Sequence, residues 1–153
     1  MVVSGSGTRL EELAHHLFDV VTRFCLCVPR SRRRLGDLKE IEFLTLSLLH
    51  QREKLIVGDI QRQLGVLPAQ MSRIIRALEN RERPLIACRI NPRDKRKIDV
   101  CLTAAGEKAL VDYQAVRIGR LTELLRHLSE EDQDDLSRLL DKLHNRLDRS
   151  PTP

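Results

Sequence analysis

The stretch over residues 58–103 constrains the fold of this chain most, because a helical pattern stops and restarts within it. Ile60 and Leu64 lie four residues apart and therefore share one helix face. Gly65 follows where a helix end favours a residue that tolerates positive φ, and Pro68 suits the first turn of a new helix. A helix, a short turn with glycine and a second helix predict a helix-turn-helix.

The second helix, expected over residues 68–80, has two chemically different faces. Its inward face is apolar and carries Met71, Ile74, Ile75 and Leu78. Its outward face carries Gln70, Ser72, Arg73, Arg76 and Ala77. These side chains provide two guanidiniums, an amide and a hydroxyl but no carboxylate. In the major groove, Arg can bond guanine and Gln adenine through paired hydrogen bonds. An ordinary solvated face is the alternative, because Arg is also a good helix former.

Two segments with alternating apolar residues follow and predict a β-hairpin. The side chains expected to face the core are Ile86, Cys88 and Ile90 on the first strand and Ile98, Val100 and Leu102 on the second. The connecting residues 91–97 contain turn formers and are strongly basic, with Arg93, Lys95, Arg96 and Lys97 against the single acid Asp94. Such a tip could lie on the DNA backbone or enter a minor groove. Solubility is the alternative, and the neighbouring helix-turn-helix favours DNA.

The positive charge of the chain is concentrated around these elements. The 153 residues carry a formal net charge of +5. From Arg52 to Val100, twelve Lys and Arg stand against six Asp and Glu, whereas from Arg120 to Ser150 six stand against eight. This distribution is the electrostatic footprint that DNA binding requires. An aromatic content of 3% argues against stacking platforms for single-stranded nucleic acid.

The flanking segments predict helices with long apolar stripes, so the expected fold class is mainly α with a small β-hairpin wing. The predicted organisation is a disordered N-terminus (1–7), a dimerisation helix and linker (8–35), a winged helix-turn-helix DNA-binding domain (36–103), C-terminal dimerisation helices (104–149) and a tail (150–153). The flanking helices contain more Leu than a winged helix-turn-helix domain of this size, which we call the head, can bury. We therefore expect a symmetric homodimer whose recognition helices lie roughly 34 Å apart on a palindromic site. The alternative is an intramolecular hairpin of the last two helices.

The run from Asp94 to Gly106 contains Asp-x-Arg, a hydrophobic strand and then Leu-Thr-x-x-Gly. It resembles the wing and exit signature of the MarR family of bacterial transcription regulators. Residues 71–79 are similar to the recognition helix of that family, and residues 59–66 to the helix before it. The resemblance implies that Gln70, Ser72, Arg73 and Arg76 face the major groove and that Arg96 lies near the minor groove. It also implies that Asp94 braces the wing by pairing with a nearby Arg, and that Thr103 caps the next helix.

Two positions depart from the family pattern. Residues 80–84 stand where the family has a shorter connection containing Gly, which affects the link from recognition helix to wing. Val66 and Leu67 stand where a Ser or Thr often caps the recognition helix, so that cap is expected to be weaker.

The cysteines and histidines suggest no metal site or cofactor. Cys25 and Cys27 lie two apart on a predicted helix and so point in different directions, which excludes a metal or redox pair between them. Some MarR relatives sense peroxide through a Cys on the first helix, which makes these two the candidate redox residues. No histidine spacing resembles a zinc site. No phosphate-binding loop or nucleophile elbow is present, so an enzyme is not expected.

The chain contains no apolar run long enough to cross a membrane and no secretory signal, so a cytoplasmic location without membrane contact is expected. The sequence thus predicts a homodimeric regulator that binds double-stranded DNA, a repressor released by a small-molecule effector or by oxidation. The alternative is a winged-helix protein-interaction module that does not bind DNA.

Overall fold

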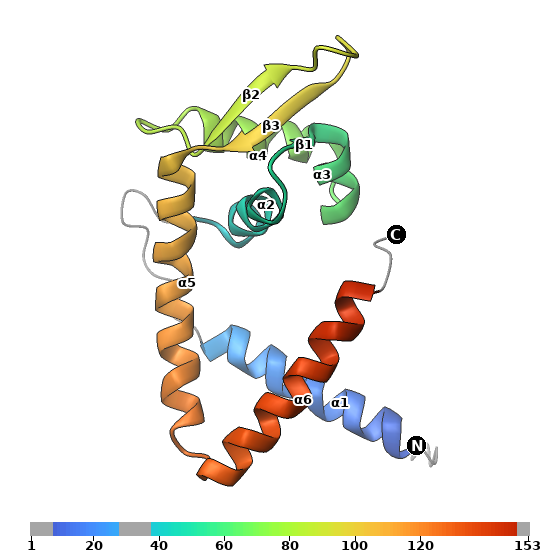
Figure 1. Ribbon diagram of the computed structural model, residues 1–153, viewed down its shortest axis with the longest axis vertical. Coiled ribbons are helices and arrows are strands. Elements are labelled where there is room, and N and C mark those ends of the chain that lie inside the picture. Colours follow the sequence, from blue (N-terminus) through green and yellow to red (C-terminus); the bar gives the residue numbers. More distant parts are fainter. Residues whose placement is uncertain (1–7, 28–37, 150–153) are drawn as a thin grey trace, which may run out of the picture. The chain divides into compact units, whose positions relative to one another are not determined.

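The computed structural model describes residues 8–27 and 38–149 (Figure 1). The chain divides into two compact units, residues 1–35 and 36–153. The first contains helix α1 (Arg9–Cys27), and every other element belongs to the second. The predictions of a disordered N-terminus, a linker after the first helix and a C-terminal tail concern residues outside the described ranges.

Helix α1 begins at a capping box formed by Thr8 and Glu11. The N–H of Thr8 donates to Glu11 Oε2 at 2.8 Å, and the N–H of Glu11 donates back to Thr8 Oγ1 at 3.3 Å. No residue of α1 is buried, and Leu10, Leu13 and Phe18 are each more than 60% exposed.

The second unit opens with α2 (Glu40–Gln51), the short strand β1 (Leu55–Ile56) and α3 (Val57–Leu64). Helix α4 (Pro68–Glu79), strands β2 (Ile86–Ile90) and β3 (Ile98–Leu102), and helices α5 (Ala104–Leu125) and α6 (Glu130–Arg149) follow. The turn between α3 and α4 depends on Gly65, which adopts φ 63° at the end of α3. The predicted helix-turn-helix is thus confirmed nearly to the residue.

The hairpin is one part of a three-stranded antiparallel sheet in the order β1-β3-β2. Leu55 of β1 pairs with Val100, which also pairs with Cys88 on the other side. The sequence analysis missed β1, because two residues are too few to show an alternating pattern. This strand fixes the root of the wing to the segment that enters the helix-turn-helix.

The core of the second unit lies between the sheet and helices α2 to α5, and its most deeply buried members are Leu46, Ile60, Met71, Leu78, Ile86, Val100 and Leu110. Two predicted core positions are wrong: Ile90 is 68% exposed and Ile98 45%. Ile90 and Ile98 lie on the same face of the hairpin as the core-facing residues of their strands. The loop end of the hairpin extends past the helices, so these two side chains remain exposed (Figure 1).

Helices α5 and α6 both begin at side-chain caps. Thr103 Oγ1 accepts the N–H of Gly106 at 3.0 Å, as the family resemblance implies, and Ser129 Oγ accepts the N–H of Asp132 at 3.2 Å. Helix α5 continues through Gly119. No residue of α6 is buried, and Leu139, Leu140, Leu143 and Leu147 are at least half exposed. No helix among the described residues combines the length and apolarity needed to span a bilayer.

Candidate nucleic-acid interface

Helix α4 has the two faces that its sequence predicts. Met71, Ile74 and Leu78 are buried beneath it. The four candidate DNA-contacting side chains are all exposed, namely Gln70, Ser72, Arg73 and Arg76. The helix starts at Leu67 with no side-chain cap and has Pro68 in its first turn, as expected from the absent Ser or Thr. The buried positions fix how α4 is rotated, so the polar face must point outward.

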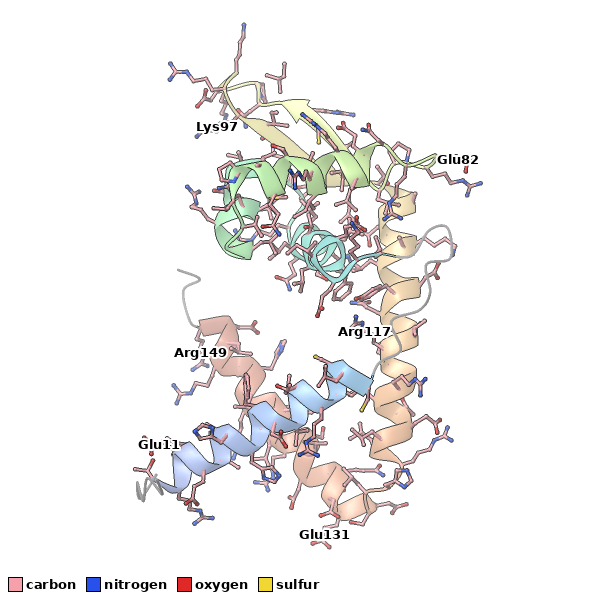
Figure 2. All side chains as sticks on the ribbon, turned by 180° about the vertical axis from the view of Figure 1, so that it is seen from behind. Glu11, Glu82, Lys97, Arg117, Glu131 and Arg149 are labelled. Carbon is pink, nitrogen blue, oxygen red and sulfur yellow. The ribbon has the colours of Figure 1, made fainter. Side chains whose placement is uncertain are left out.

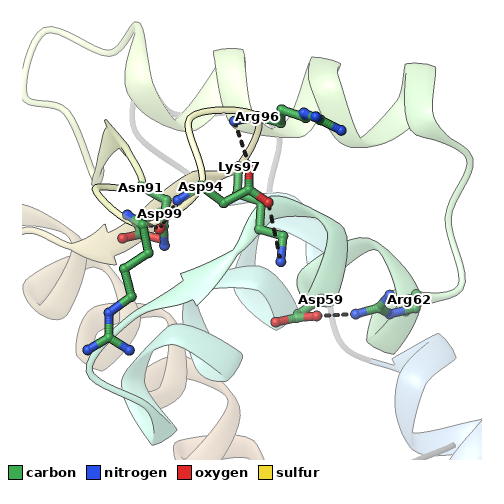
Figure 3. Close-up of polar contacts among 8 residues, drawn as sticks. Asp59, Arg62, Asn91, Asp94, Arg96, Lys97 and Asp99 are labelled. Carbon is green, nitrogen blue, oxygen red and sulfur yellow. Dashed lines mark hydrogen bonds and ion pairs between the residues drawn. The ribbon is translucent and has the colours of Figure 1, made fainter.

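The two guanidiniums of this face are not neutralised by carboxylates of the described residues. By contrast, Arg62 on α3 is paired with Asp59 three residues earlier (Figure 3). Arg73 and Arg76 therefore keep their donors and their charge available, which is the condition for bonding phosphates or base edges.

The wing tip presents the second group of candidate residues, and Arg93, Lys95, Arg96 and Lys97 are all exposed there. Asp94 is half-buried beneath them, and its Oδ1 accepts the N–H of Arg96 at 3.1 Å. Its other oxygen lies 3.7 Å from Lys97 Nζ (Figure 3). The expected arginine side-chain partner of Asp94 is not found among the described residues, where a lysine side chain and a main-chain N–H contact this carboxylate instead.

Asn91 organises the turn that carries these cations. Its Oδ1 accepts the N–H groups of Arg93 at 2.9 Å and Asp94 at 3.0 Å, an arrangement typical of Asx turns. Its Nδ2 donates to Asp99 Oδ1 at 2.8 Å, and the other carboxylate oxygen of Asp99 lies 3.5 Å from Lys54 Nζ. Asp99 is only 13% exposed. The sequence indicated a turn over residues 91–97, but no local pattern indicated the contacts of Asp99.

The base of the wing is fixed to the start of α5. Thr103 Oγ1 donates to the carbonyl oxygen of Pro84 at 2.6 Å, and the Thr103 N–H donates to that of Leu85 at 3.2 Å. A Cβ on Gly106 would lie only 2.1 Å from the Leu85 oxygen. Thr103 and Gly106 of the Leu-Thr-x-x-Gly signature are therefore needed where the backbone of β2 crosses α5.

The cysteines differ sharply in environment. Cys25 and Cys27 are both exposed on α1. Burial raises the pKa of the Cys88 thiol to about 11, and the nearby Glu79 carboxylate acts in the same direction. Cys101 Sγ lies 3.7 Å from the carbonyl oxygen of Ala87. In the part of the chain that the structure describes, no group of three or more His, Cys, Asp or Glu side chains could hold a metal ion.

Comparison with known proteins agrees with this arrangement. The MarR family model matches residues 38–98. The fold resembles YusO from Bacillus subtilis, with 22% identity, a TM-score of 0.67, and coverage of 93% of this chain and 99% of that one. It also resembles a mutant of S. aureus MepR bound to an oligodeoxyribonucleotide, with 23% identity, a TM-score of 0.60, and coverage of 88% and 97%.

A third similar structure concerns the regulation of DNA binding of Bordetella bronchiseptica BpsR by 6-hydroxynicotinic acid. It has 20% identity to this chain, a TM-score of 0.61, and coverage of 87% of this chain and 98% of that one. No curated protein matches the chain. The three structures share the fold, while the family match falls on the segment that contains α2 to the start of β3.

Proposed function

We propose that this chain is a transcription regulator of the MarR family that binds specific sites on double-stranded DNA as a homodimer, because residues 38–98 match the MarR family model. One observation carries the proposal. The exposed polar face of α4 and the cationic wing tip belong to the same head, and only Lys97 among their cations pairs with a carboxylate of the described residues, as Arg62 does on α3. A helix-turn-helix with a basic wing is built for a duplex, whose major groove admits the helix.

The two groups of residues have separate tasks in this proposal. Arg73 and Gln70 read base edges in the major groove, while Ser72 and Arg76 supply further polar contacts from the same face. Arg93, Lys95, Arg96 and Lys97 bind the phosphate backbone or the adjacent minor groove, which supplies affinity and register. Asp94 holds the turn and does not touch DNA, because phosphates repel it.

The dimer is supported by apolar helix faces that lack cover. Helices α1 and α6 have no buried residue, although both carry an apolar stripe. Pairing of two chains through such stripes removes this surface from water. Two-fold symmetry then places two recognition helices about one DNA turn apart, roughly 34 Å, on a palindromic operator.

We further propose that the regulator is a repressor and that a small-molecule effector releases it from DNA. The structure of BpsR concerns such control by 6-hydroxynicotinic acid in that protein. Oxidation of Cys25 or Cys27 is the second route, supported by their exposure on α1. The two routes separate in one assay, because retained DNA affinity after peroxide treatment excludes the cysteine route.

The decisive experiment measures affinity for a duplex selected from a random pool, by fluorescence anisotropy across a range of salt concentrations. The Arg73→Ala/Arg96→Ala variant should lose most of its affinity, since a base-contacting Arg such as Arg73 contributes about 1–3 kcal/mol and Arg96 supplies a further backbone or minor-groove contact. A control, Arg120→Ala/Arg126→Ala, removes the same charge near the end of α5 and should bind nearly as wild type. Wild-type affinity should fall steeply with salt. A flat salt response, or equal binding by both variants, would favour the protein-interaction module.

A further inference from the structure

The five residues that join α4 to β2 contain no glycine, yet they form an ordered link. We call residues 80–84 the link. It leaves α4 at Asn80, whose N–H donates to the carbonyl oxygen of Arg76 at 2.9 Å. It returns to the same helix at Leu85, whose N–H donates to the carbonyl oxygen of Leu78 at 3.0 Å. The Thr103 contacts already described hold its last residue against α5.

The first half of the link is held by an ion pair with α2. Arg81 Nη2 donates to Glu42 Oε2 at 2.8 Å, with side chains that are only 23% and 5% exposed. The same carboxylate oxygen accepts the N–H of Lys39 at 3.0 Å, just before α2 begins. A carboxylate this buried is costly unless it is paired, so the loss of Arg81 would leave an uncompensated charge.

Helix α2 is itself braced against α5, so Glu42 is a firm attachment point. The ring of Phe43 stacks on that of Tyr113 with centroids 4.4 Å apart. His50 Nδ1 lies 2.9 Å from Glu107 Oε2 at the other end of α2. The link is thereby attached to two helices that are joined to each other, through Arg81 on one side and Pro84 on the other.

We propose that Glu42 and Arg81 are positioning residues for DNA binding, and that their ion pair sets the angle between recognition helix α4 and the wing. The inference rests on the proposed function. The link is the direct covalent connection from α4 to β2, so its conformation governs whether both elements reach one duplex. Figure 2 places Lys97 at the wing tip and Glu82 on the link at the opposite end of the head, so the pair acts at a distance.

The direction in which Glu42→Gln changes the affinity for DNA distinguishes a positioning role from a long-range electrostatic effect. Glu42→Gln removes a negative charge, and a less acidic protein should bind a polyanion more tightly if long-range charge alone matters. The positioning role predicts the opposite, a loss of affinity. Arg81→Met weakens binding under both accounts, so its control is Arg83→Met, which removes an equal charge from an exposed position of the same link.

The test uses the full chain and the selected duplex, with dissociation constants from anisotropy and thermal melts from circular dichroism. We expect Glu42→Gln and Arg81→Met each to weaken binding about tenfold, the equivalent of roughly 1.4 kcal/mol, and Arg83→Met to do so much less. Adding Arg96→Ala should reduce the DNA affinity by a smaller factor in the Glu42→Gln variant than in the wild type, because the wing of that variant is already misplaced. A purely structural role would lower the melting temperature without changing that cost.

Three results would overturn the inference. These are wild-type or tighter binding by folded Glu42→Gln, equal affinities of the Arg81→Met and Arg83→Met variants, and an undiminished effect of Arg96→Ala. If Glu42→Gln does not fold, the comparison between the two arginine variants decides alone. Absence of duplex binding by the wild type would instead remove the proposed function, and the inference with it, so the two failures are distinguishable.

Discussion

Replacement of Gly106 by alanine should destabilise the head, whereas the same change at Gly119 in the same helix should stabilise it. A Cβ at position 106 would lie 2.1 Å from the Leu85 carbonyl oxygen and 3.1 Å from Leu102 Cδ2. At position 119 nothing lies within 4 Å. Both glycines are helical, so the pair isolates the effect of close packing from that of helix propensity.

The expected magnitude follows from these distances. To bring the new methyl group to ordinary contact at 3.4 Å, the Leu85 backbone must retreat by about 1.3 Å. Such overpacking costs about 1–3 kcal/mol. The same shift disturbs the N-cap of α5, which lowers the free energy of unfolding by about 1 kcal/mol. The higher helix propensity of alanine offsets this loss by about 1 kcal/mol. Gly106→Ala should therefore lose roughly 1–3 kcal/mol, and Gly119→Ala should gain up to about 1 kcal/mol.

Thermal and urea unfolding followed by far-UV circular dichroism would measure the difference. For a chain of this length, 1 kcal/mol corresponds to roughly 2–4 °C in melting temperature, so the two variants should separate by several degrees. Protein concentrations must match, because the stability of a dimer depends on concentration. Equal melting temperatures for the two variants would refute the close approach of β2 and α5.

Two further predictions concern the wing and the sheet. Asn91→Ala should speed amide hydrogen exchange over residues 93–97 and weaken DNA binding severalfold. The melting temperature should change little, since the turn lies outside the core. Unchanged amide exchange would contradict this prediction. Cys88 keeps its proton in the folded state up to a pKa of about 11, whereas the unfolded thiol ionises near 9.0. Wild-type stability should therefore fall relative to Cys88→Ala as pH rises from 9 to about 11, with no relative change below pH 9, and parallel curves would exclude the effect.

The sequence was informative wherever the cause of structure is local. Gly65 and Pro68 are specific to the end of one helix and the start of the next, so the boundaries of α3 and α4 could be predicted closely. The periodicity of buried residues fixed the outward face of α4. For the same reason, the eight candidate DNA-contacting side chains lie exposed on the elements expected for them.

The failures occurred where the cause is an interaction between distant residues. Strand β1 exists because Leu55 can pair with Val100, which no local pattern reveals. The exposure of Ile90 and Ile98 depends on where the helices end beneath the hairpin, and alternation alone cannot indicate this. Asp94 pairs with Lys97 because of the particular turn that Asn91 imposes.

The contacts of three acidic residues in the head also could not be predicted from local sequence, and they bear on the charge available for DNA binding. Glu42 holds the link, Asp94 holds the wing turn, and Asp99 joins the wing root to Lys54. All three are buried or half-buried within the framework, whereas Arg73 and Arg76 are exposed. Counting charges along the sequence treats these acids as if they opposed the exposed arginines. Glu42 lies outside the stretch from Arg52 to Val100, and Asp94 and Asp99 pair with Lys97 and Lys54, which are counted among its twelve cations. These pairs therefore leave the net balance of the stretch unchanged, and its excess positive charge includes the exposed Arg73 and Arg76 of α4.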